Sequence, residues 1–83
     1  MAKKDKIYEK KLENGTYIFK LYKLLEDKGI SQNKFMREAP AEFTTMKNYA
    51  TGNIQRIDIY VMDRWCNYLN CTDDDIIEYI PKS

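Results

Sequence analysis

Apolar residues recur at helical spacing along the chain from about residue 16 onward. The first such stripe holds four large side chains, Ile18, Leu21, Tyr22 and Leu25. This spacing predicts a helix over residues 17–28, with Thr16 as its N-cap. Gly29 follows at the position where a left-handed residue commonly ends a helix.

Two short helices are predicted next, over residues 32–39 and 42–50. Ser31 is a natural N-cap for the first of them. Pro40 ends it, because proline lacks an N–H group and its ring clashes with the preceding turn. The second helix has apolar residues at positions i, i+3, i+6 and i+7 and is closed by Gly52. These residues are Phe43, Met46, Tyr49 and Ala50.

Two further helices are predicted near the C-terminus. One covers residues 59–70 with Asp58 as its N-cap, and the other covers residues 73–80 between Thr72 and Pro81. The three aspartates at 73–75 fit a helix start, where the dipole favours negative charge. They lack the alternating ligand spacing of an EF-hand calcium loop. The expected fold is therefore all-α, with five helices around a central helix-turn-helix.

The first 15 residues are polar and rich in lysine. A polar N-terminal arm with a short helix over residues 5–12, ended by Asn14-Gly15, is the first interpretation. A β-hairpin about Asn14-Gly15 is the second, because alternation before that dipeptide is poor. The expected organisation is thus an arm over residues 1–15 and one domain over residues 16–83.

The two central helices share a turn of little more than two residues. Such a connection forces a sharp crossing and leaves the second helix projecting, which is the helix-turn-helix arrangement. A helix in the major groove must carry its polar groups outward in a row. The candidate base contacts on residues 42–50 are Phe43, Thr44, Lys47 and Asn48.

Several short motifs occur in one order and at one spacing. Ser31-Gln32 opens the second helix, Gly52 closes the third, and Leu69-Asn70-Cys71 precedes Asp75-Ile76-Ile77-Glu78-Tyr79. With these motifs the chain resembles the lambda-repressor/Cro-like helix-turn-helix family over residues 16–80, and most closely its compact regulators from mobile elements and phages. The family usually has glycine in the turn, where this chain has Pro40, so the turn must differ locally.

The resemblance implies DNA-phosphate contacts outside the third helix. Gln32 would contact the backbone and brace the recognition helix. The loop after that helix would run along the phosphates with Asn53, Gln55 and Arg56, of which Arg56 is the strongest candidate. On the second helix, Lys34 and Arg37 are weaker candidates for phosphate contacts.

Charge is unevenly distributed although the net charge is only +1. Residues 1–56 hold twelve of the fourteen Lys/Arg and seven of the thirteen Asp/Glu. The first part of the chain is therefore basic, and residues 57–83 are acidic. A basic front suits a protein that presents one end to a polyanion, although chance segregation remains an alternative. The chain lacks histidine, so no catalytic or metal-binding set is evident, and no cofactor is expected.

Cys66 and Cys71 are interpreted as buried or half-buried thiols in a reducing, cytoplasmic setting, because neither a signal peptide nor a membrane span is visible. The expected function is a sequence-specific transcriptional regulator, not an enzyme, that binds double-stranded DNA as a homodimer. The alternative is a protein-binding module on the same fold, such as an antitoxin, anti-repressor or nuclease inhibitor. Glu42, Phe43 and the low net charge favour that alternative. RNA binding ranks last, because no RNA-module signature is present.

Overall fold

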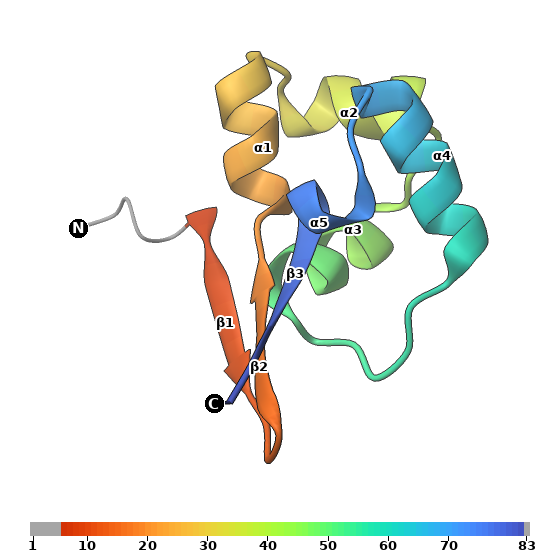
Figure 1. Cartoon of the computed structure of the whole chain (residues 1–83). Helices are drawn as coiled ribbons and strands as arrows, with labels where there is room; N and C mark the ends of the chain where they lie inside the picture. Colours follow the sequence, from red (N-terminus) through yellow and green to blue (C-terminus); the bar gives the residue numbers. More distant parts are fainter. Residues whose placement is uncertain (1–5, 83) are drawn as a thin grey trace.

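A β-hairpin contains the first two strands of the protein. The computed structural model describes residues 6–82, in which β1 (Tyr8–Lys11) pairs antiparallel with β2 (Gly15–Phe19). A third strand, β3 (Ile77–Pro81), pairs with the other edge of β2. The expected helix over residues 5–12 is therefore wrong where the structure describes it, and the hairpin ranked second is the one that forms. The all-α fold class is wrong as well, because a three-stranded antiparallel sheet accompanies the helices (Figure 1).

Five helices complete the described part of the chain. They are α1 (Leu21–Lys28), α2 (Gln32–Glu38), α3 (Phe43–Thr51), α4 (Ile59–Leu69) and α5 (Asp73–Ile76). Three of them, α2, α4 and α5, start at the predicted caps Ser31, Asp58 and Thr72. The Ser31 hydroxyl accepts from the Lys34 N–H at 3.1 Å, and the Asp58 carboxylate accepts from the Tyr60 N–H at 2.9 Å. Gly29 and Gly52 close α1 and α3 in the left-handed conformation, as predicted.

The first and last helices are shorter than predicted because strands take their outer residues. Ile18 lies in β2, so α1 begins at Leu21, and Thr16 is not its N-cap. The helix expected over residues 73–80 ends at Ile76, because Ile77–Pro81 pairs with β2 instead. Pro81 is tolerated there since β3 is an edge strand.

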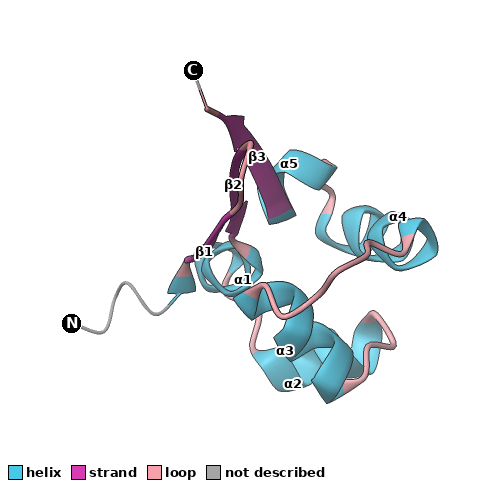
Figure 2. Cartoon of the chain, turned by 90° about the horizontal axis from the view of Figure 1, so that it is seen from below, coloured by secondary structure: helices cyan, strands magenta, loops and turns pink. Residues whose placement is uncertain are grey.

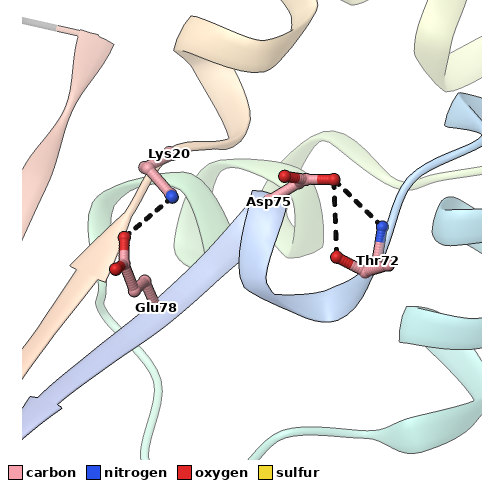
Figure 3. A network of polar contacts seen from close by, with 4 residues as sticks. All are labelled: Lys20, Thr72, Asp75 and Glu78. Carbon is pink, nitrogen blue, oxygen red and sulfur yellow. Dashed lines mark hydrogen bonds and ion pairs between the residues drawn. The ribbon is translucent and has the colours of Figure 1, made fainter.

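Polar contacts mark the place where the chain changes from helix to strand at both ends of the domain (Figure 3). The Lys20 N–H donates to the Ile76 carbonyl at 2.8 Å, and its ammonium pairs with Glu78 at 2.9 Å. The Asp75 carboxylate accepts from the Thr72 N–H at 3.1 Å, which satisfies a free donor at the start of α5. The two contacts of Lys20 therefore join the end of β2 to the junction between α5 and β3.

The sheet turns one aromatic face toward the helices. The rings of Tyr17 and Tyr79 lie across neighbouring strands with centroids 4.8 Å apart. Tyr79 covers Gly15, and a Cβ at Gly15 would lie 2.5 Å from the Tyr79 hydroxyl oxygen. Only glycine therefore fits under this ring without a shift of the neighbouring strand.

The helical core is centred on Trp65, which is fully buried. Its ring meets the edge of Phe35 from α2 at 5.3 Å between centroids, and that of Tyr49 from α3 at 5.1 Å. A single side chain of α4 thus contacts both helices of the helix-turn-helix. In Figure 2, α2 and α3 lie on the side of the molecule away from the C-terminal end of β3.

The hairpin also holds the end of α3. The Lys10 ammonium donates to the carbonyls of Gly52 and Ile54, at 3.2 and 3.3 Å. A cation at this place satisfies carbonyls that have no partner in the helix and suits the negative end of the helix dipole. Gly52 also lies against the Phe19 ring, where a Cβ would come within 2.8 Å of a ring carbon.

The two cysteines are half-buried and free, as interpreted from the sequence. Burial raises the pKa of the Cys66 thiol to about 12, and its hydrogen bond to Asp73 at 3.2 Å acts in the same direction. Cys66 is therefore a protonated packing residue at neutral pH.

Gly15→Ala tests the close approach of Tyr79. We expect it to lower the free energy of unfolding by about 1–3 kcal/mol, because the added methyl group overpacks the strand pair. Chemical denaturation measures this cost. In a Tyr79→Ala background the same change should cost less, since two of the three closest atoms are removed. An equal cost in both backgrounds would contradict the contact.

Lys10→Met tests the fastening of the hairpin to α3. Methionine keeps much of the side chain's apolar length but leaves two carbonyls without their charged donor, so we expect a loss of about 1–2 kcal/mol in unfolding free energy. Lys11→Met is the matched control, because Lys11 is exposed and has no side-chain hydrogen bond within residues 6–82. Equal losses in the two variants would refute the assignment.

Candidate nucleic-acid interface

The helix-turn-helix is built from α2, a short turn and α3. Phe35 of α2 and Met46 of α3 are fully buried, and they fix the inner faces of both helices. The Tyr68 hydroxyl of α4 donates to Glu38 at 2.6 Å, which ties the end of α2 to α4. The arrangement leaves the first turn of α2 and the outer face of α3 exposed.

The turn at Pro40 avoids the left-handed conformation that a glycine would supply. Ala39 has φ −99° and ψ 21°, which lies outside the helical region but short of the extended conformation that a residue before proline usually adopts. The Ala41 N–H donates to the Met36 carbonyl at 3.0 Å, so a carbonyl in the last turn of α2 keeps a partner. Asn70 is the only non-glycine residue with positive φ among residues 6–82, and it lies elsewhere.

The outer face of α3 carries three of the four predicted base-contact residues. Phe43, Thr44 and Lys47 are exposed, whereas Met46, Tyr49 and Ala50 pack inward. The Lys47 ammonium lies 6.0 Å from the centre of the Phe43 ring, one helical turn away. This distance allows a weak cation–π contact, which groups an apolar and a cationic side chain at the start of the helix.

Asn48, the fourth predicted base-contact residue, differs from the others. It is half-buried, and its side-chain oxygen accepts from the Asn53 amide at 3.4 Å. Its carbonyl also accepts from the backbone N–H groups of Gly52 and Asn53, each at 3.0 Å. The structure thus brings Asn48 and Asn53, predicted for different roles, into one group at the end of α3.

The loop between α3 and α4 is held at both ends. Lys10 binds the carbonyls of Gly52 and Ile54, and the Tyr49 hydroxyl accepts from the Asp58 N–H at 2.8 Å. Arg56, Asn53 and Gln55 are exposed on this loop. The candidate phosphate contacts on α2, Gln32 and Lys34, are exposed at its first turn.

Sequence reasoning missed the part that Lys10 plays in positioning this loop. Lys10 lies 42 and 44 residues before its two carbonyl partners, so no local pattern connects them. A signal was present in the aromatic residues Tyr8 and Phe19, which pair with each other across the hairpin that turns at Asn14-Gly15. Lys10 follows Tyr8 on the same face of the first strand, opposite Tyr17, so a lysine interrupts the apolar alternation that would indicate a strand.

The described residues contain neither a metal-binding cluster nor a membrane-spanning helix. Within residues 6–82, no three His, Cys, Asp or Glu side chains are arranged to hold a metal ion. Over the same residues, every helix is too short or too polar to traverse a lipid bilayer.

The comparisons with known proteins agree with this geometry. The sequence profile of the Cro/C1-type HTH DNA-binding domain matches residues 20–82. Among solved structures, the crystal structure of the transcriptional regulator VanUg (form II) is similar, with a TM-score of 0.63 and 24% sequence identity. The similarity covers 86% of this chain and 93% of that one, and it concerns the fold. No curated protein sequence is significantly similar to this chain.

The profile covers all five helices and the third strand, which together contain the exposed face of α3 and the loop that follows it. The chain therefore belongs to the family of Cro/C1-type helix-turn-helix DNA-binding domains.

Proposed function

We propose that this protein is a sequence-specific transcriptional regulator whose recognition helix is the segment predicted at residues 42–50, now α3. The observation that carries the proposal is the division of α3 into two faces. Phe43, Thr44 and Lys47 are exposed together, while the opposite face is buried against the core. The major groove accepts one α-helix, and this face is polar enough to meet base edges there.

The proposed base contacts follow from side-chain chemistry. Lys47 can donate to guanine O6 and N7, and Asn48 can bond adenine through both atoms of its amide once its weak contact with Asn53 opens. Thr44 and Phe43 can contact a thymine methyl group. Phe43 is 54% exposed, which leaves its ring available for such a contact.

The proposed phosphate contacts lie on both sides of α3. Gln32 and Lys34 stand at the first turn of α2, and Asn53 and Arg56 stand on the loop after α3. Such contacts fix the register of a protein on the duplex without reading its sequence. A homodimer acting in the cytoplasm would place two copies of α3 about one DNA turn apart, on a near-palindromic operator.

A second candidate function is binding to another protein through the same face. The exposed Phe43 ring supports it, together with Glu42, the N-cap residue of α3, whose exposed carboxylate makes no capping hydrogen bond. A carboxylate at this place repels phosphate, and an exposed aromatic ring fits a protein pocket. An antitoxin, anti-repressor or nuclease inhibitor would use this chemistry.

Lys47→Ala tests the recognition helix on duplexes selected from a random library by the unaltered protein. We expect discrimination between selected and random duplexes to fall by about 1–3 kcal/mol, because one base-edge donor is removed. Lys23→Ala is the control, since it removes the same charge from α1, where Lys23 pairs with Asp27 at 2.9 Å. Similar loss of discrimination in both variants would mean that α3 does not read the sequence.

Binding to random duplex DNA at low salt separates the two candidate functions. A DNA-binding protein should give a mobility shift whose affinity falls linearly with salt on logarithmic axes. Lys34→Gln should reduce that slope by about 1, because one phosphate contact is lost, whereas Lys23→Gln should leave it unchanged. The absence of any shift at low salt would favour the protein-binding function.

A further inference from the structure

A groove separates the hairpin from the loop between α3 and α4. It encloses about 490 Å³, and five of the eight residues that line it are apolar or aromatic: Leu12, Tyr17, Phe19, Ile54 and Ile57. Lys10, Gln55 and Arg56 complete its lining, and no residue of α3 contributes. In Figure 1 the turn of the hairpin and this loop both lie below α3.

An apolar ridge follows directly after the groove along the chain. Ile57 is 44% exposed and lines the groove, and Ile59 and Tyr60, at the start of α4, are 71% and 76% exposed. Ile59 and Tyr60 are the two most exposed large hydrophobic residues in the described part of the chain. Packing within the domain does not account for side chains that remain this open to water.

Charge on the two features is complementary. Arg56 is an exposed cation in the lining of the groove. Asp63 is an exposed acid on α4, four residues after Ile59 and three after Tyr60, so it lies on the face that the ridge occupies. A groove with a cation and a ridge with an acid therefore stand side by side on one chain.

We propose that this surface is a homodimer interface, in which the ridge of each copy enters the groove of the other about a two-fold axis. In an isologous contact a patch must be complementary to itself, and a groove beside a ridge of matching chemistry satisfies that condition. The pairing buries Ile59 and Tyr60 of each copy and sets Asp63 against Arg56 of its partner. The proposal rests on the dimeric regulator proposed above and names the surface that joins its two copies.

The groove is preformed, which favours such docking. Lys10 holds two carbonyls at one end of the loop, and the Tyr49 hydroxyl accepts from the Asp58 N–H at the other. Little ordering of the loop is therefore needed when the two copies meet. Phe43, Thr44 and Lys47 lie outside the groove lining, so the interface leaves them accessible. Arg56 carries five N–H donors, enough to bind both a carboxylate and a phosphate.

Sedimentation equilibrium of the full chain tests the interface. The unaltered protein should be a dimer, and the double variant Ile59→Ser, Tyr60→Ser should raise the dimer dissociation constant by more than about tenfold, since aromatic anchors dominate interface energies. Ile80→Ser is the control, because Ile80 is 46% exposed on β3 and does not line the groove. Circular dichroism confirms that each variant is folded.

A charge exchange tests the pairing itself. Arg56→Glu and Asp63→Arg should each weaken the dimer, and the two together should restore it, because the pair is then reversed across the interface. The proposal is overturned if the unaltered protein stays monomeric at millimolar concentration, which would leave the groove to another occupant. It is also overturned if only Ile80→Ser disrupts the dimer, or if the exchanged pair fails to restore it.

Binding to random duplex DNA keeps this proposal separate from the proposed function. The serine variant, if monomeric, should still bind random duplex in a salt-sensitive manner, because Lys34 and Lys47 are unchanged. A dimer that forms through this surface but binds no DNA would refute the regulator function alone. DNA binding by a protein that never dimerises would refute this interface alone.

Discussion

The edge-on packing of Trp65 against Phe35 and Tyr49 is the contact on which the helix-turn-helix depends. A helix-turn-helix of seven and nine residues has too few intrahelical bonds to hold its own crossing angle. One fully buried ring of α4 contacts both helices and sets their inner faces. The contacts of Trp65 with the inner faces of α2 and α3 therefore fix the orientation of the outer face of α3, and the turn at Pro40 does not.

The hairpin gives α3 a second support at its other end. Phe19 lies against Gly52, and Lys10 supplies a cation to the carbonyls of Gly52 and Ile54. Together these contacts connect α3, the loop that follows it and the sheet into one body. The same contacts form one wall of the groove, so the fold that orients α3 also shapes the proposed dimer surface.

Low net charge is compatible with DNA binding here because the cations are placed selectively. Lys34, Lys47 and Arg56 are exposed on α2, α3 and the loop after α3. On α2, the carboxylate of Glu38 accepts a hydrogen bond from the Tyr68 hydroxyl. Glu42 differs from Glu38, because it lies exposed at the head of α3.

The sequence by itself determined the central helices, because their signals are local. Ser31 and Asp58 cap their helices through side-chain contacts within three residues, and Gly29 and Gly52 stop theirs by adopting positive φ. The family motifs depend on the same short-range pattern, so the placement of α3 needed no knowledge of the tertiary structure.

Only the tertiary structure decided the sheet. Residues 77–81 match a helical stripe as well as a strand, and pairing with β2, whose residues lie 58 to 66 positions earlier in the chain, settles the choice. The hairpin was hard to predict because Lys10, a charged residue, occupies an inward position, where its ammonium donates to the carbonyls of Gly52 and Ile54. The hairpin was therefore only the second interpretation. Neither the pairing of β3 with β2 nor the contacts of Lys10 with the end of α3 leave a periodic trace, because both join residues that are far apart in the sequence.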